Sequence, residues 1–179
     1  MVFVFLAEGF EEIEAISTID ILRRCGVTVQ TVSITDTKTV CGSHGISVIA
    51  DALLKEIDPS AGKAFVLPGG LPGSDNLQNC KPLEEILKTE SRNGKIVAAI
   101  CAAPKVLGAF DILEGRLATC YPGFEEELTG AEFVPDRAVL DGNIITSRGA
   151  GTASDFAFLI AKSLGKDTDS IRKGMLYDI

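Results

Sequence analysis

The sequence has no Cys-x-x-Cys pair, no cluster of basic residues and no apolar run near the roughly 20 residues that span a bilayer. Its five cysteines are odd in number and scattered, which argues against a disulfide framework or a zinc site and favours a reducing compartment. A net charge of −8 argues against the basic face that nucleic acid requires. We therefore expect a cytoplasmic protein with no metal and with neither nucleic acid nor membrane as a partner.

Repeats, low-complexity tracts and linker-like segments are also lacking. The 179 residues suit one compact domain, and 46% apolar with 23% charged residues is ordinary globular composition. The apolar run at residues 2–7 has no basic flank and leads directly into Glu8, so it predicts a strand rather than a signal peptide. We expect residues 1–179 to form a single domain.

Short apolar runs alternate with helical patterns along most of the chain. Residues 2–7 resemble a strand buried on both faces, and apolar residues at helical spacing predict a helix over 12–25 that Gly26 ends. Similar signals predict strands at 27–34, 64–67, 95–100 and 116–120, hairpins within 37–50 and 138–146, and helices from about 102 and at 82–91, 124–128, 152–164 and 167–176. This alternation predicts an α/β fold with a mainly parallel sheet and helices on both faces.

Three stretches that can carry chemistry follow the carboxyl ends of predicted strands. They are the acidic segment at residues 8–14, the pair Gly69 and Gly70, and Cys101. In an open α/β sheet, ligands bind beyond these strand ends. We therefore expect the three stretches to meet in one site.

Cys101 lies between an apolar strand and a helix start rich in small residues. Ala102 and Ala103 permit a tight turn, and Pro104 suits the first turn of a helix. The arrangement resembles a nucleophile elbow, in which a strained backbone presents the side chain to a pocket. Because a helix N-terminus stabilises a thiolate, we predict a thiol that is ionised near neutral pH. A packed core thiol is the alternative, since free cysteines are often buried.

Glu14 and the two glycines are the predicted partners of this thiol. Glu14 lies close to the apolar face of its helix, so desolvation should raise its pKa and keep it protonated as a donor to the sulfur. Gly69 and Gly70 can offer backbone N–H groups to an oxyanion, although a glycine turn that only ends the strand is the alternative.

Two further residues are weaker candidates. Arg148 can bind an anion beside a helix N-terminus, but an ion pair with a surface carboxylate is favoured. His44, the single histidine, lies in the turn of a predicted hairpin, so we expect an exposed loop residue rather than the base of a cysteine–histidine pair.

Four stretches together resemble the ThiJ/PfpI superfamily, in the branch typified by the Parkinsonism-associated deglycase. They are AEGFEEIE at 7–14, VLPGG at 66–70, AICAAP at 99–104 and TSRGAGT at 146–152. The resemblance spans nearly the whole chain and implies a flavodoxin-like three-layer sandwich, related to class I glutamine amidotransferases, and a homodimer. It also implies that Cys101 oxidises readily to sulfinic acid and is hydrogen-bonded to Glu14.

The chain departs from the family pattern at two positions, Tyr121 and Ala150, and also lacks a histidine typical of another branch. Tyr121 stands where many members have a histidine, and a tyrosine with an unperturbed pKa of about 10 is a poor general base. Proton transfer would then fall to Glu14 or water, so we expect slow catalysis. Ala102 replaces the histidine of the protease-like branch, which argues against peptidase chemistry, and Ala150 replaces a frequent proline.

Two functions remain open. In the first, which the resemblance implies, Cys101 adds to the aldehyde carbon of an α-oxoaldehyde such as methylglyoxal, or attacks early glycation adducts, without any cofactor. Backbone N–H groups around Gly70 and Ala102 would hold the oxyanion, and Glu14 would move the proton. In the second, the protein is a redox sensor or stress chaperone whose Cys101 oxidises to the sulfinate with little catalysis. The missing histidine favours the second.

Overall fold

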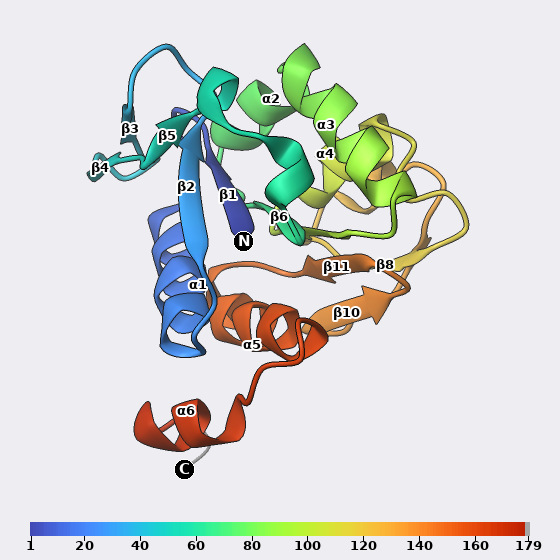
Figure 1. The fold of residues 1–179 in the computed structure, drawn as a ribbon. Coiled ribbons are helices and arrows are strands. Elements are labelled where there is room, and N and C mark those ends of the chain that lie inside the picture. The colour runs from blue at the N-terminus through green and yellow to red at the C-terminus, as the bar shows by residue number, and fades with distance from the viewer. Residues whose placement is uncertain (178–179) are drawn as a thin grey trace.

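The computed structural model describes residues 1–177, which form a seven-stranded sheet between two layers of helices (Figure 1). The strand order is β10-β11-β7-β6-β1-β2-β5. Every neighbouring pair is parallel except β10 with β11. The strands are β1 (Val2–Leu6), β2 (Val29–Ser33), β5 (Ala52–Leu53), β6 (Ala64–Leu67), β7 (Ile96–Ile100), β10 (Ala138–Asp141) and β11 (Ile144–Ser147).

Helices cover both faces of this sheet. One face carries α1 (Glu12–Arg24) and α5 (Ala153–Ser163), which pack against each other, and α6 (Asp169–Gly174) follows beyond α5 (Figure 1). The opposite face carries α2 (Gly73–Gln78), α3 (Lys81–Arg92) and α4 (Pro104–Ala109). The predicted α/β class and flavodoxin-like three-layer arrangement are confirmed. None of the helices within residues 1–177 combines the length and apolar character needed to cross a membrane.

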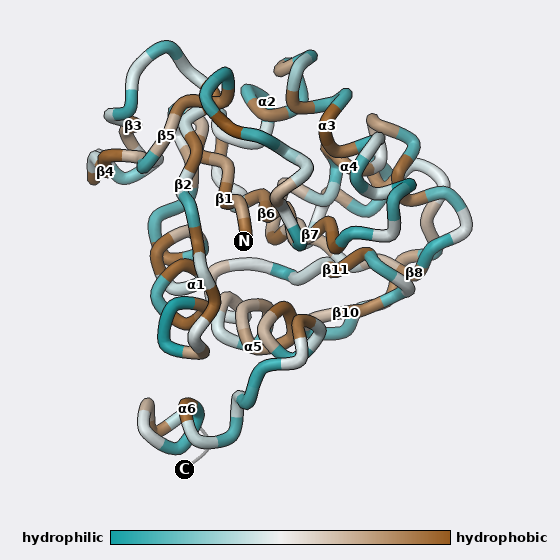
Figure 2. The backbone as a smooth tube through the Cα atoms, in the orientation of Figure 1, coloured by the Kyte–Doolittle hydropathy of each residue, from teal (hydrophilic) through white to brown (hydrophobic). Residues whose placement is uncertain are grey.

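Strand β1 lies at the centre of the core and is buried along its whole length. Its side chains alternate: Val4 and Leu6 pack in the layer with α1 and α5, whereas Phe3 and Phe5 pack in the other layer, where both contact the ring of Phe65. The central strands are accordingly hydrophobic in Figure 2. A strand covered on both faces needs apolar residues at every position, which explains the uninterrupted run in the sequence.

Several predicted boundaries differ from the structure. The strand expected at 116–120 is only β8 (Leu117–Ala118), which pairs with β9 (Glu132–Phe133) outside the main sheet. It ends early because the Thr119 N–H donates to the Thr146 side-chain Oγ1 on β11 instead of to a backbone carbonyl of a neighbouring strand. The helix expected at 124–128 is a single 3-10 turn at Glu125–Glu127. Helix α2 escapes prediction because its sequence, GSDNLQ, has a single apolar residue.

The expected hairpin after β2 is present as β3 (Thr39–Cys41) and β4 (Ser47–Ile49), which form a separate two-stranded sheet. It lies at the edge of the molecule, beside β5 and the end of β2 (Figure 1). Its turn contacts the loop that follows β1, because the Ser43 N–H donates to the Phe10 carbonyl and the Gly9 N–H donates to the Cys41 carbonyl. The hairpin is therefore attached to the start of α1.

Candidate active site

The three predicted site segments meet at one edge of the sheet. Strands β1, β6 and β7 are adjacent and parallel, so their carboxyl ends lie together. The Glu11 N–H donates to the Gly69 carbonyl at 2.9 Å and thereby joins the loop after β1 to the loop after β6. Gly69 in turn lies directly beside Cys101 and Glu14. The expected convergence of the three loops is confirmed.

Cys101 has the strained backbone of an elbow. Its φ of 65° lies in the left-handed region, which costs a residue other than glycine about 1 to 3 kcal/mol. Its N–H donates to the Ser147 carbonyl and its carbonyl accepts the Tyr121 N–H, both at 2.9 Å. The side chain is partly exposed, whereas Cys25 and Cys120 are buried. These features argue against a packed core thiol.

Both predicted glycines are places where the backbone approaches too closely for a side chain. A Cβ on Gly69 would lie 2.6 Å from both Cys101 Cβ and Glu14 Oε2. Gly70 has a φ of +91°, and a Cβ there would lie 2.5 Å from the backbone of Gly9 and Glu11. The two glycines therefore permit the thiol, the carboxyl and the loop after β1 to come together, rather than only ending the strand. The expected oxyanion role of Gly69 is wrong, because its N–H donates to Glu14 Oε2 instead.

Glu14 is buried within this edge, with 1% of its surface exposed. Its Oε2 accepts the Gly69 N–H at 2.8 Å, while its buried Oε1 has no hydrogen-bond partner among the described residues. Burial, with a smaller contribution from the Glu11 charge, raises the pKa of Glu14 to about 7 against the opposing interaction with Cys101 and the Gly69 hydrogen bond. The predicted rise through desolvation is confirmed.

The expectation that Cys101 is ionised near neutral pH is wrong. Burial, followed by the negative charge of Glu14, raises the pKa of the thiol to about 12. The backbone N–H groups of Ala102 and Gly70 interact with the sulfur and lower the pKa, but by less. The tertiary structure explains the difference. It buries the thiol beside the Glu14 carboxylate, and these two effects on the pKa outweigh the opposing effect of the nearby peptide N–H groups.

Cys101 and Glu14 are better described as one titrating pair. The pKa of each group is raised by burial, and each group's charge or hydrogen bond acts on the other, so after losing one proton the pair holds the remaining proton tightly. That proton can lie on sulfur or on the carboxyl, and the two forms have equal net charge. Moving it to the carboxyl creates a thiolate facing the N–H groups of Gly70 and Ala102. The arrangement can therefore produce a nucleophile by proton transfer inside the site.

Tyr121, at the position of the substituted family histidine, borders the same space. It is half exposed, and its ring contacts Phe124 edge-on with 6.5 Å between centroids. A Cβ on Gly149 would lie 3.2 Å from the Tyr121 ring and 3.9 Å from Cys101 Sγ. Sequence reasoning does not single out Gly149, and the only signal is the run of small residues around it. That Tyr121 is a poor general base, which leaves proton transfer to Glu14 or water, stays a prediction.

Arg148 does not have its predicted surroundings. Its guanidinium donates to the Pro135 carbonyl at 3.3 Å and lies 5.9 Å from the centroid of the Phe133 ring. The expected ion pair with a surface carboxylate is wrong for the residues described, because Arg148 packs over the segment before β10 instead. It therefore braces a loop in this structure.

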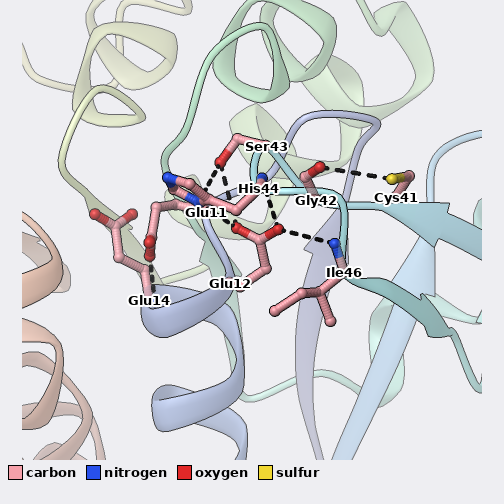
Figure 3. A network of polar contacts seen from close by, with 8 residues as sticks. All are labelled: Glu11, Glu12, Glu14, Cys41, Gly42, Ser43, His44 and Ile46. Carbon is pink, nitrogen blue, oxygen red and sulfur yellow. Dashed lines mark hydrogen bonds and ion pairs between the residues drawn. The ribbon is translucent and has the colours of Figure 1, made fainter.

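His44 is exposed as predicted, but it has a partner, Glu12 (Figure 3). Its Nδ1 lies 2.8 Å from Glu12 Oε2, and Glu12 also accepts from Ser43 Oγ and from the backbone N–H groups of His44 and Ile46. Burial would raise the pKa of Glu12, yet the hydrogen bonds from His44 and Ile46 bring it down to about 2. Glu12 thus fastens the hairpin to α1.

Glu11, Glu12 and His44 are the residues that could hold a metal ion. They can present ligand atoms that lie within 4.8 Å of one another. The four hydrogen bonds to Glu12 account for its burial without an ion, and the N-cap bond from the Glu14 N–H occupies Glu11 Oε2 at 2.7 Å. That the protein needs neither metal nor cofactor stays a prediction.

Comparison with known proteins agrees with this geometry. Among curated relatives, the chain is 44% identical over 169 residues to protein DJ-1 homolog B of Arabidopsis thaliana, covering 93% of this chain and 39% of that protein. It is 36% identical over 159 residues to the glutathione-independent glyoxalase DJR-1.2 of Caenorhabditis elegans, covering 88% and 84%. The chain spans about two fifths of the length of the Arabidopsis relative.

Solved structures give the same result. A structure of Toxoplasma gondii DJ-1 described as oxidized superposes with a TM-score of 0.95 at 35% identity, covering 99% of this chain and 98% of that one. Residues 1–163 match the DJ-1/PfpI family. The match includes all three site segments, from the start of α1 through the two glycines to Cys101. The chain belongs to the DJ-1/PfpI family.

Proposed function

We propose that the protein is a cofactor-free glyoxalase or deglycase in which Cys101 attacks α-oxoaldehydes such as methylglyoxal, or early glycation adducts. The observation that carries the proposal is the buried Glu14 carboxyl beside Cys101, a partly exposed sulfur with two N–H groups next to it. The name of the Caenorhabditis elegans relative, a glutathione-independent glyoxalase, supports this class of reaction.

The first step is addition of the thiol to the aldehyde. As the new C–S bond forms, the thiol proton passes to the Glu14 carboxylate and the electron pair of the aldehyde C=O bond moves to its oxygen. The N–H groups of Gly70 and Ala102 lie where they can stabilise this oxyanion. Glu14 then returns the proton to that oxygen, which gives a hemithioacetal.

The second step moves a proton between neighbouring carbons. The Glu14 carboxylate removes the proton from the carbon attached to sulfur, which gives an enediolate. The hydroxyl proton on that carbon passes to the former ketone oxygen, and Glu14 delivers its proton to the former ketone carbon. The product is a thioester on Cys101, and water hydrolyses it to lactate and the free thiol. Water is the sole co-reactant. Because Tyr121 stands in place of histidine, one acid–base partner is missing, and such a loss lowers rates by a factor of about 10² to 10⁴.

The test is lactate production from methylglyoxal. We expect slow turnover by the wild type and none by Cys101→Ser or Glu14→Gln. Cys41→Ser is the matched control, because Cys41 is also partly exposed but lies on the β3–β4 hairpin, and it should retain full turnover. Turnover that survives in Cys101→Ser, or that is absent from the wild type, would contradict the proposal.

A second candidate function is redox sensing, in which Cys101 is an oxidation switch and a stress-chaperone role is the output. The supporting observation is the unpartnered Oε1 of Glu14, which in the protonated state can donate a hydrogen bond to a sulfinate oxygen on Cys101. A relative from Toxoplasma gondii has a structure described as oxidized. Clean conversion of Cys101 to the sulfinic acid under mild peroxide, together with no lactate from methylglyoxal, would favour this function.

We also propose a homodimer. Four isoleucines are exposed on α1 and on the hairpin attached to it, and exposed apolar side chains on neighbouring elements suit an interaction surface. They are Ile13, Ile16, Ile46 and Ile49. Light scattering should give twice the monomer mass for the wild type and a lower mass for Ile16→Lys, and a monomeric wild type would refute the proposal.

A cytoplasmic location is the last part of the proposal. All five cysteines are free thiols, which is typical of proteins in a reducing compartment. A fluorescent fusion of the full-length protein would test it. Accumulation in an oxidising compartment would contradict it.

A further inference from the structure

Lys105 is a buried lysine in the first turn of the helix that follows Cys101. Only 8% of its surface is exposed, and lysines are seldom buried without partners. Its Nζ lies 2.6 Å from Asp75 Oδ1 and 3.7 Å from Glu127 Oε2, and 5.5 Å from the centroid of the Phe124 ring. One ammonium group therefore has three partners on two other segments.

Each of those segments is part of the candidate active site. Asp75 lies on α2, which begins directly after the Gly70 loop, and the Ser74 N–H donates to the Gly70 carbonyl at 2.8 Å. Phe124 follows Tyr121, and the two rings are in contact. Lys105 itself lies on α4, which begins directly after the Cys101 turn. The ammonium group thus lies where the three segments come together.

Helix α4 packs closely against the segment that follows Tyr121. A Cβ on Gly108 would overlap the Glu127 carbonyl and lie 2.8 Å from the Thr129 nitrogen, so α4 touches the segment after Tyr121 backbone to backbone. That segment has only one 3-10 turn of its own, at Glu125–Glu127. Its position relative to Cys101 therefore depends on the Tyr121 N–H bond to the Cys101 carbonyl and on contacts with α4, and Lys105 supplies the charged ones.

We propose that Lys105 is a positioning residue that holds the Gly70 loop, the Cys101 turn and the Tyr121 segment in their active arrangement. The proposal rests on the thiol chemistry proposed for Cys101. Without the ammonium group, α2 and the Tyr121 segment can shift relative to α4, which moves the Gly70 N–H away from the sulfur. A displacement of about 1 Å at a reacting group can lower a rate by about 100-fold.

Three variants test the proposal. Lys105→Met removes the charge and keeps most of the side-chain volume, and Asp75→Asn removes the closest partner. Lys95→Met is the matched control: Lys95 lies just before the opposite end of β7, with its Nζ 2.8 Å from Glu90 and 6.0 Å from the centroid of the Phe65 ring. The measurements are the rate of alkylation of Cys101 by iodoacetamide, and kcat and KM for methylglyoxal.

We expect Lys105→Met and Asp75→Asn each to slow alkylation about tenfold and to lower kcat about tenfold with little change in KM. The double variant should be no slower than either single one, because both lose the same contact. Lys95→Met should alkylate like the wild type even if its stability falls. These results would support a positioning role.

The Asp75→Asn variant separates a positioning role from a direct electrostatic effect of the Asp75 charge on the Cys101 thiolate. Removing a nearby negative charge by itself would favour the thiolate and speed alkylation, whereas losing the tether would slow it. Alkylation at or above the wild-type rate in Asp75→Asn would overturn the proposal, as would equal rates in Lys105→Met and Lys95→Met. If Lys105→Met does not fold, the Asp75→Asn variant still tests the proposal, because the Asp75 side chain is half exposed and its substitution should leave folding intact. A wild type that alkylates but makes no lactate would refute the proposed reaction and leave this test intact.

Discussion

Two carboxylates on the same helix behave in opposite ways. Glu12 and Glu14 both lie in the first turn of α1 and are both buried, with 6% and 1% of their surface exposed. The pKa of Glu12 is lowered to about 2, whereas that of Glu14 is raised to about 7. In Figure 3 the Glu12 carboxylate points toward His44 and Ser43, and the Glu14 carboxylate points to the other side.

The difference lies in the number of donors that each carboxylate faces. Glu12 accepts four hydrogen bonds, one of them from the histidine side chain. Glu14 accepts one backbone N–H, at Oε2, and faces a sulfur that competes for the same proton. A carboxylate with many donors keeps its charge and holds structure together, whereas one with few donors is left able to exchange a proton.

The largest expected difference between the two is in catalysis. Glu14→Gln should lower kcat/KM for methylglyoxal by about 100-fold or more, because an amide cannot accept and return a proton. Glu12→Gln should remain within a few-fold of the wild type, since its carboxylate faces the hairpin. Steady-state kinetics on variants with wild-type circular dichroism give the answer. Equal losses would show that the two carboxylates are not functionally distinct.

Tyr121→His adds a proton acceptor that, like Cys101, borders Gly149. If the missing base limits turnover, the substitution should raise kcat about tenfold, because an imidazole titrates near neutral pH. Tyr121→Phe serves as the control for loss of the hydroxyl and should not gain activity. An unchanged rate in Tyr121→His would show that Glu14 alone already supplies the proton transfers.

The pH dependence of Cys101 alkylation tests the shared proton. The wild-type rate should rise through about pH 7, where the pair loses its first proton, and rise again at high pH. Glu14→Gln should lose the step near pH 7 and keep a single later one, and Glu12→Gln should follow the wild type. A single step in the wild type at the value of an ordinary thiol would mean that the two groups do not titrate together.

The smallest effect concerns stability, measured by urea unfolding across pH. Because the pKa of Glu14 in the folded protein lies above its usual 4.5, the contribution of Glu14 to the free energy of unfolding should weaken as pH rises from about 4.5 to about 7. The folded pKa of Glu12 lies below 4.5, so its contribution should be present above that value and fall toward about pH 2. Glu14→Gln should remove the first trend and Glu12→Gln the second. A trend that persists in its own variant would assign it to another group.

Much of the fold and the outline of the site follow from local sequence. The run in β1 is apolar at every position, and the small residues after Cys101 permit its positive φ. Both are short-range properties of the chain, as are the two glycines after β6. Weakly patterned segments escape prediction: α2 is nearly all polar, and its position depends on the loop and helix it packs against.

By itself, the sequence determined the three-layer fold, the elbow at Cys101 and the Glu14, Gly69 and Gly70 segments beside it, because periodicity and turn chemistry act over a few neighbouring positions. Only the tertiary structure decided which of those residues carry charge. Desolvation and hydrogen bonding depend on groups distant in the chain, so Cys101 has a raised pKa, Glu12 is held by His44, and Lys105 meets Asp75. The spacing of residues along a chain does not specify how many donors surround a buried acid.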